Sequence, residues 1–250
     1  MSHRPLVAVP ADNILYQHCE KYAISKQYLN SLFELANVSP IIIPPLLHKN
    51  VADILKYVNG ILLTGAVSNV HPSRYNSPVT EQHQPFDEER DAISFSMIDY
   101  ALKYNLPILG VCRGLQELNT YLGGTLSNDI QELDGKIDHR SCDSTNISER
   151  FKIKHTVNIV PNRLLDNIIN QKSISVNSLH RQAIDVLADK LQIEAIATDN
   201  TIEAVSMKDT EQFILAFQWH PEYWYNNEAI SKKIFAAFSK AIYEDYTRKN

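Results

Sequence analysis

The sequence is poor in cysteine and has no long apolar run, and these absences exclude several classes of protein. Its three cysteines, Cys19, Cys112 and Cys142, are too few and of the wrong parity for a disulfide framework. We therefore expect free thiols and a cytoplasmic location, where thiols stay reduced. No apolar stretch approaches the roughly 20 residues that span a bilayer. The first five residues lead into the apolar segment 6–9 without a signal-peptide core, so no membrane association is expected.

The sequence also has no large excess of either positive or negative charge. The 24 Lys and Arg residues and the 29 Asp and Glu residues leave a net charge of −5, with no long run of either sign. A nucleic-acid partner normally requires a basic face, so none is expected. Neither the P-loop pattern G-x-x-x-x-G-K-[ST] nor a strand-linked G-x-G-x-x-G occurs, which argues against a phosphate-binding cradle.

The rest of the composition is that of an ordinary globular protein. Apolar residues make up 44% and charged residues 21% of the sequence. A chain of 250 residues can bury a substantial core without disulfide staples. We find no repeat, low-complexity block or linker, so residues 1–250 are predicted to form a single domain.

The first two-thirds of the sequence alternates apolar strands with helices. Strands are predicted at 6–10, 39–44, 60–64 and 106–111, and helices at 22–36, 51–58 and 86–104. Continuous apolar strands that alternate with helices are typical of a parallel sheet covered on both faces. Ligands of such sheets bind outside the carboxyl ends of the strands.

The pattern changes after a polar segment at 134–149, which we expect to be a surface loop. Further strands are predicted at 155–160, 173–176, 192–198, 202–205 and 213–218, followed by an amphipathic closing helix at 228–246. We therefore predict an α/β fold with a mostly parallel central sheet flanked by helices and a more antiparallel second half.

One cysteine stands at a predicted strand-to-helix corner. Cys112 follows the apolar run that ends at Val111, and a helical pattern of leucines comes after it. Gly110 and Gly114 flank it as G-x-C-x-G, which is similar to the nucleophile elbow G-x-S-x-G. In such a corner glycine relieves crowding, and the helix N-terminus favours a thiolate. The alternative is that Cys112 is a small buried apolar residue.

A base and an acid for this thiol are available at the end of another predicted strand. His220 follows the apolar run 213–217, and Glu222 lies two residues further on. A histidine can accept the thiol proton, and a carboxylate on its other ring nitrogen fixes the tautomer and stabilises the imidazolium. Pro221 stiffens the spacing between them. A lone His-Pro-Glu is usually part of a loop, so this pattern gains its meaning from Cys112.

Several motifs together resemble a known family. They are "GVCRGLQELN", "GGTL", "NSLHRQ", "IEAV" and "FQWHPE", with "SNVHPSRY" and "PFDEERD" upstream. Over about residues 5 to 240 the sequence resembles the class I glutamine amidotransferase superfamily, and within it most closely the stand-alone gamma-glutamyl-gamma-aminobutyrate hydrolase family. The resemblance implies a flavodoxin-like core. It also implies hydrolysis of a small γ-glutamyl amide through a γ-glutamyl thioester, with no metal or organic cofactor.

The resemblance implies roles for individual residues near the corner. Cys112 is the nucleophile, His220 the general base and Glu222 the orienting acid. The backbone N–H groups of Gly65 and Arg113 form the oxyanion hole, in which one donor is typically worth about 3 kcal/mol.

The resemblance also implies substrate-binding positions. Gln116 matches a residue that helps to hold the glutamyl group; alternatively, it only belongs to a polar helix face. The family segment that lines the substrate pocket is matched by Asn177, Ser178, Leu179, His180 and Arg181. His180 is a second candidate for the base, ranked lower because no carboxylate follows it at short range.

Three positions depart from the family pattern. Ala66 and Asn76 stand where glycine is usual, and Asn69 stands in place of aspartate. The Cβ atom of Ala66 is tolerated if its φ angle is negative. These positions fall where the leaving amine is expected to bind, so the resemblance does not specify that amine.

Other interpretations stay open at this point. Two groups of potential zinc ligands lack a matching second pair at the usual spacing, so no metal site is predicted; they are His18-Cys19-Glu20 and His139…Cys142…His155. The glutaminase subunit of a two-chain amidotransferase is one alternative function, although no synthetase domain is present. A non-catalytic binding protein on the same fold is another. The sequence does not determine whether the chain forms a homo-oligomer.

Overall fold

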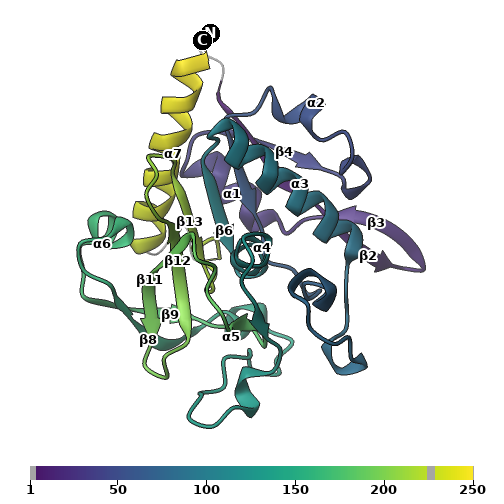
Figure 1. Cartoon of the computed structure of the whole chain (residues 1–250), viewed down its shortest axis with the longest axis vertical. Coiled ribbons are helices and arrows are strands. Elements are labelled where there is room, and N and C mark those ends of the chain that lie inside the picture. Colours follow the sequence, from purple (N-terminus) through teal and green to yellow (C-terminus); the bar gives the residue numbers. More distant parts are fainter. Residues whose placement is uncertain (1–3, 224–228, 250) are drawn as a thin grey trace.

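Nine strands form one sheet, and their order decides which strand ends meet. The computed structural model describes residues 4–223 and 229–249 (Figure 1). The first five strands across the sheet are β4 (Ser39–Ile43), β1 (Leu6–Pro10), β5 (Gly60–Leu63), β6 (Ile108–Val111) and β13 (Ile214–Phe217). Neighbours among these five all pair in parallel. This order is the flavodoxin-like arrangement, and it confirms the predicted parallel half.

The other half of the sheet is antiparallel, as predicted. After β13 come β12 (Ile202–Met207), β11 (Leu191–Ala197), β8 (Ile153–Ile159) and β9 (Ser173–Asn177), and each pairs antiparallel with the strand before it. Two small sheets lie outside this one: β2 (Asp12–Tyr16) with β3 (Cys19–Ala23), and β7 (Leu126–Ser127) with β10 (Ala183–Ile184).

Helices cover both faces of the sheet because its strand residues alternate between two apolar clusters. One cluster joins Val7 and Val9 to α1 (Lys26–Glu34), α6 (Leu164–Ile169) and α7 (Ala229–Lys249). The other joins Ala8 to α2 (Ala52–Leu55), α3 (Glu88–Tyr104) and α4 (Arg113–Tyr121). Figure 1 shows the strands running through the middle of the molecule between these helices. Both faces of the parallel half are therefore buried.

The remaining helical segments are short. They are α5 (Ile147–Arg150) and the 3₁₀ turns Pro45–Leu47, Pro72–Tyr75, Glu81–His83 and Ile130–Glu132. No helix among the described residues is both long and apolar enough to span a bilayer. The predicted closing helix is present as α7, and its predicted first residue, Glu228, lies outside the described residues.

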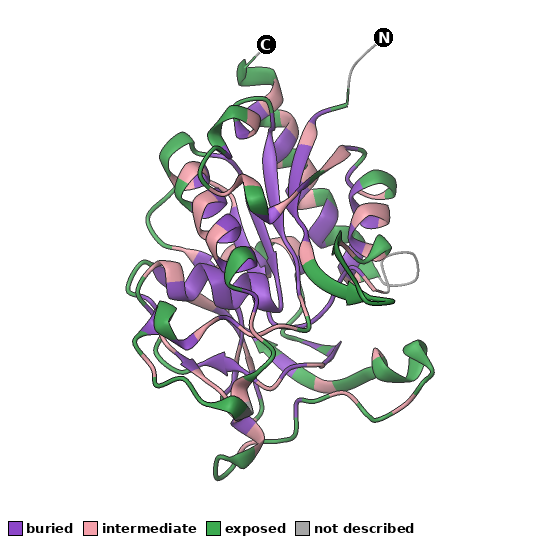
Figure 2. Cartoon of the chain, turned by 90° about the vertical axis from the view of Figure 1, so that its right-hand side faces the viewer, coloured by how far each residue is buried: buried purple, intermediate pink, exposed green. Residues whose placement is uncertain are grey.

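The prediction for the region 12–36 is wrong in its first half. The helix predicted at 22–36 is the shorter α1, and the hairpin β2–β3 precedes it. Gln17 and His18, which form the turn of this hairpin, both have positive φ angles, a conformation usually marked by glycine or asparagine. The sequence carries no such signal there. Figure 2 shows the sheet as the buried centre, whereas this hairpin is exposed along nearly its whole length.

The corner between β6 and α4 has no room for a side chain on its glycines. A Cβ atom on Gly114 would lie 2.4 Å from the backbone oxygen of Leu63 in β5. A Cβ atom on Gly110 would lie 2.8 Å from the Cβ atom of Ala216 in β13. The two glycines of the predicted elbow are thus required by the close approach of α4 to the sheet.

This packing predicts that Gly114→Ala is destabilising. The added methyl group meets backbone, which cannot move aside, so we expect the free energy of unfolding to fall by about 1–3 kcal/mol or more. Urea denaturation measures this change. Gly60→Ala is the matched control, because its Cβ atom would lie 3.0 Å from the side chain of Ile242 and no closer than 3.5 Å to backbone, at the oxygen of Pro107. Equal losses in the two variants would contradict the described packing of α4 on β5.

Candidate active site

The predicted catalytic residues come from three neighbouring parallel strands. Gly65 lies two residues after β5, Cys112 directly follows β6, and His220 lies three residues after β13. These strands are adjacent in the sheet. Because the carboxyl ends of parallel strands meet at one edge, the three residues gather there.

Cys112 occupies a strained corner. It has φ 50° and ψ −101°, a region that a residue other than glycine rarely adopts. Its N–H donates to the backbone oxygen of Phe217 at 2.6 Å, which ties the corner to β13. The residue is 7% exposed and immediately precedes α4, whose N-terminal dipole favours an anion. Strain of this kind is typical of functional sites.

His220 lies between a carboxylate and the cysteine. Its Nδ1 atom is 2.8 Å from Oε1 of Glu222, and both residues are buried. A Cβ atom on Gly65 would lie 2.9 Å from Cε1 of His220 and 3.2 Å from the Cβ atom of Cys112, so both side chains border the same space. Burial alone lowers the pKa of His220, but the negative charges of Glu222 and Cys112 and its hydrogen bonds to both residues raise that pKa to about 10.

Tyr28 enters this site from α1, and no motif in the sequence indicates that it does. Its hydroxyl accepts a hydrogen bond from the N–H of Gly65 at 2.9 Å and lies 3.5 Å from Nδ1 of His220. Burial, followed by the charges of Glu222 and Cys112, raises the pKa of Tyr28 well above its ordinary value. Its place in a helical pattern gave no sign of this contact, which joins residues 192 positions apart.

Gln218 connects Gln116, the predicted substrate-binding residue, to the thiol of Cys112. Nε2 of Gln116 donates to the backbone oxygen of Gln182 at 2.9 Å and to Oε1 of Gln218 at 3.1 Å. Nε2 of Gln218 in turn lies 3.5 Å from the sulfur of Cys112. Gln218 belongs to the motif "FQWHPE" but was not singled out from the sequence. Gln116 therefore faces the site and not an open helix surface, and it is buried.

The segment predicted to line the substrate pocket divides into two parts. Asn177 holds the backbone of His220, accepting from its N–H at 2.8 Å and donating to its oxygen at 3.0 Å. The side chains of Ser178 and His180 contact other residues instead of His220. The Ser178 hydroxyl donates to the backbone oxygen of His139 at 2.8 Å, and Nε2 of His180 lies 3.6 Å from Oε1 of Glu203. Across the described residues, no hydrogen bond or ion pair joins these two side chains to the predicted triad.

The other two residues of that segment, Leu179 and Arg181, lie nearer the surface. Leu179 is half-buried, and the half-buried Arg181 pairs with Asp129, with Nη2 2.8 Å from Oδ1. His180 does have a carboxylate neighbour, Glu203, although none follows it closely in the sequence. Burial lowers the pKa of His180, so its ring is neutral near pH 7.

The positions that depart from the family pattern are accommodated by the backbone. Ala66 is not among the described residues with positive φ, which is the condition under which its Cβ atom is tolerated. Asn76 has φ 54° at the end of the turn Pro72–Tyr75, a left-handed conformation that asparagine adopts most readily after glycine. The Asn69 side chain donates from Nδ2 to the backbone oxygen of His83 at 2.7 Å.

Arg113 has a role beyond its backbone. As the first residue of α4, it carries one of the N–H groups that a helix leaves without an intrahelical partner. Its guanidinium is buried, lies 2.6 Å from Oδ1 of Asp91 and pairs with Glu117. Its Nε atom donates to the backbone oxygen of Ser68 at 3.0 Å. The side chain thus fixes the loop after β5, which the sequence did not indicate.

Known proteins resemble this chain in sequence or in fold. A gamma-glutamyl-gamma-aminobutyrate hydrolase of Escherichia coli O157:H7 is 31% identical, and the alignment covers 100% of this chain and 97% of that protein. Two solved structures share the fold. A glutamine amidotransferase from Thermotoga maritima is 14% identical with a TM-score of 0.58, covering 97% of this chain and 98% of that one. The glutaminase domain of Trypanosoma brucei CTPS is 18% identical with a TM-score of 0.62, covering 96% and 94%.

The family comparison extends over most of the sequence. The family model described as Peptidase C26 matches residues 5–222, from the start of the first strand to Glu222. With the full-length relative and the shared fold, this confirms the resemblance drawn from the motifs. The chain therefore belongs to the Peptidase C26 family of class I glutamine amidotransferase-like hydrolases.

Proposed function

We propose that this hydrolase cleaves the amide bond of a small γ-glutamyl compound through a γ-glutamyl thioester on Cys112. The observation that carries the proposal is the ordered contact of Glu222 with His220 beside the strained Cys112 corner. The name of the full-length relative supplies the substrate class, of which gamma-glutamyl-gamma-aminobutyrate is one example. No part of this chemistry requires a metal or an organic cofactor.

Each step uses a group at the carboxyl edge of the sheet. Cys112, as a thiolate, attacks the γ-carbonyl carbon, and the tetrahedral adduct collapses as His220 protonates the departing amine. His220 then removes a proton from water, which attacks the thioester and releases glutamate and the free thiol. Glu222 holds the tautomer of His220 through the 2.8 Å contact at Nδ1 and stabilises the imidazolium.

The oxyanion hole requires one rearrangement. The N–H of Gly65 donates to the Tyr28 hydroxyl, so the substrate carbonyl oxygen must take the place of that hydroxyl before this donor can serve. The N–H of Arg113 at the start of α4 is the second proposed donor. Each donor is worth about 3 kcal/mol in the transition state. Tyr28 is thus expected to move or to reorient when substrate binds.

The mechanism predicts a graded response to substitution of the three residues. Cys112→Ala and His220→Ala should each lower kcat by at least about 10⁴-fold, because each removes a group that bonds to a reacting atom. Glu222→Gln should retain roughly 100 times more activity than His220→Ala, since Glu222 only orients and stabilises. Steady-state kinetics in the presence of a chelator measure these effects.

Two results would contradict this assignment. The first is near wild-type turnover by Cys112→Ala under chelation, which would exclude thioester chemistry and favour a different catalytic group. The second is an active His220→Ala together with an inactive His180→Ala, which would transfer the role of the base to His180. Circular dichroism of each variant checks that it is folded.

The substrate class predicts strict recognition of the glutamyl half. A γ-glutamyl donor presents a free α-carboxylate and α-amine, and buried polar groups such as Gln116 discriminate strongly against analogues that cannot pair with them. We therefore expect turnover of γ-glutamyl amides to exceed that of α-glutamyl and N-acetylated controls by about 10⁴-fold. The leaving amine should be set by the loop 68–75, where the sequence departs from its relatives.

A panel of γ-glutamyl amides assayed with the purified chain alone tests this specificity. Equal turnover of the α-linked or N-blocked compounds would overturn the γ-glutamyl assignment. Activity on glutamine that appears only when a second protein is added would favour the glutaminase-subunit alternative. No turnover of any amide, with ligand binding retained, would favour a non-catalytic binding protein.

The raised pKa of His220 predicts a pH-dependent stability. The ordinary pKa of histidine is about 6.5, so the charged ring stabilises the folded state fully below that pH, and the stabilisation is lost as pH rises towards the folded-state value of about 10. Glu222 and Cys112 both contribute to the raised pKa, so the chain with Cys112 in place is the background for the measurement.

Urea denaturation of the unsubstituted chain and of His220→Gln measures this linkage. We expect the protein that retains His220 to lose its stability advantage progressively as pH rises above about 6.5. A constant difference in unfolding free energy between pH 6 and 10 would mean that His220 does not hold an additional proton in the folded state.

A further inference from the structure

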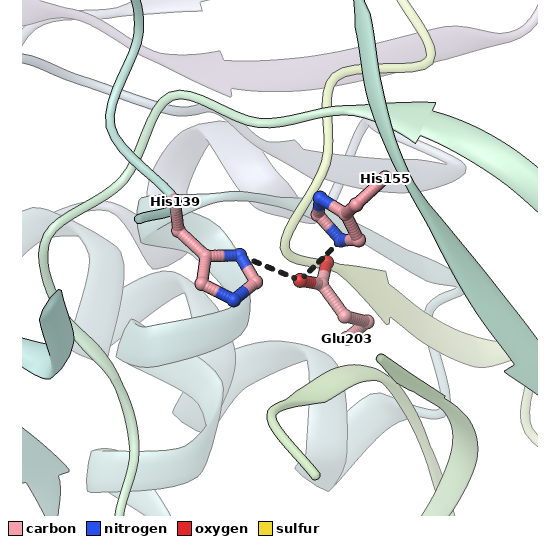
Figure 3. Close-up of side chains that lie close together, drawn as sticks. All are labelled: His139, His155 and Glu203. Atoms are coloured by element: carbon pink, nitrogen blue, oxygen red, sulfur yellow. Dashed lines mark hydrogen bonds and ion pairs between the residues drawn. The ribbon is translucent and has the colours of Figure 1, made fainter. Parts of the chain in front are cut away.

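Three histidines and one glutamate from four separate segments meet at one place, and one of these segments is 177–181. His139 lies in the loop before α5, His155 in β8, His180 after β9, and Glu203 in β12. Their side chains are 0%, 5%, 2% and 0% exposed, respectively. Figure 3 shows a ring nitrogen of His139 and one of His155 directed at the carboxylate of Glu203. We call these four residues the histidine cluster.

The donor atoms of His139, His155 and Glu203 are close enough together to bind one metal ion. Oε1 of Glu203 lies 3.0 Å from Nε2 of His155, 3.3 Å from Nδ1 of His139 and 3.6 Å from Nε2 of His180. Ligand atoms bound to Zn²⁺ at about 2.0–2.1 Å in a tetrahedron are about 3.3 Å apart. One ligand atom from each of His139, His155 and Glu203 lies within 4.8 Å of the others, so all three can reach one ion.

One ring nitrogen of His180 is buried without a hydrogen-bond partner and faces a carboxylate. Its Nδ1 atom lies 2.9 Å from the backbone oxygen of Gln182, which can only accept, so Nδ1 carries a proton. Nε2 has no hydrogen-bond partner and lies 3.6 Å from Oε1 of Glu203. A buried polar atom without a partner costs free energy, and a metal ion between Nε2 and the carboxylate would supply that partner.

His139 and His180 make the outer contacts that metal-bound histidines make, whereas Nδ1 of His155 has no hydrogen-bond partner. A ligating imidazole usually donates its other N–H to a carboxylate or to a backbone carbonyl. Nε2 of His139 lies 2.9 Å from Oδ2 of Asp199, and Nδ1 of His180 contacts the carbonyl of Gln182. Both contacts leave the remaining ring nitrogen directed at Glu203. Oε2 of Glu203 is also buried without a partner.

We propose that His139, His155, His180 and Glu203 bind one divalent transition-metal ion, for which Zn²⁺ has the matching ligands and geometry. Four protein ligands leave no open position, so the ion has a structural role. It would join the 134–149 loop to the end of β9, next to Asn177, which holds the backbone of His220.

The sequence pattern does not indicate this site for a definite reason. Cys142 stands between His139 and His155 in the sequence, but it is exposed and its sulfur contacts the backbone oxygen of Glu149 instead. The other two members of the cluster, His180 and Glu203, are separated from His155 by 25 residues or more. Ligands so dispersed do not form a motif with recognisable spacing.

Metal analysis of the full-length chain without an affinity tag tests the proposal. The Cys112→Ala variant is used so that the active-site thiol cannot bind zinc. After chelation, incubation with Zn²⁺ and gel filtration, mass spectrometry of the elements should find about one zinc per chain. Co²⁺ added instead should give the visible absorption of a four-coordinate site. Chelation should also lower the melting temperature.

Two variants in the same background locate the ion. His155→Ala should weaken zinc binding by at least about 100-fold, whereas His18→Ala, in the exposed hairpin turn, should leave it unchanged. Zinc binding that survives His155→Ala would overturn the proposal. So would less than about 0.1 zinc in the chain that retains all four ligands. The cluster would then be a metal-free ion pair between a protonated His139 and Glu203. This measurement does not depend on the proposed catalytic activity.

Discussion

The close approach of α4 to the sheet is the constraint on which the candidate site depends. Because Gly114 lies against the backbone of Leu63, α4 must begin abruptly, and Cys112 takes up a φ of 50° at the corner. A strained residue of this kind costs about 1–3 kcal/mol and persists only when its surroundings determine it. Here the hydrogen bond from its N–H to Phe217 and the packing of two glycines hold the corner in place.

Buried charge extends this constraint to the loop after β5. Arg90 and Arg113 are nearly inaccessible, and Nε of Arg90 lies 3.3 Å from Oε1 of Glu117. Buried guanidinium groups are tolerated only when they are paired and hydrogen-bonded. Arg113 meets this condition with Glu117 and Asp91, and it also donates to the backbone of Ser68. The nucleophile corner and the loop where the amine is expected are thus parts of one network.

The antiparallel half supplies the other side of the site. Asn177 at the end of β9 grips the backbone of His220, and the N–H of Gln218 donates to the backbone oxygen of Glu203 at 2.8 Å. Glu203 is the centre of the histidine cluster. Polar contacts of the antiparallel half therefore converge on the end of β13, which carries His220. Many buried polar groups thus lie in this half and not beside the thiol of Cys112.

The sequence by itself determined the strands of the parallel half and the corner at Cys112, because both depend on local signals: continuous apolar runs and two glycines at fixed spacing. The positions of Cys112, His220 and Glu222 at strand ends also led to the hypothesis that these residues form one site. The hairpin β2–β3 was missed because its turn residues, Gln17 and His18, adopt positive φ without glycine. Only the tertiary structure decided the partners of Tyr28, Gln218 and Glu203. Each contacts residues from segments distant in the sequence, and such contacts depend on which strands lie side by side, which no local pattern encodes.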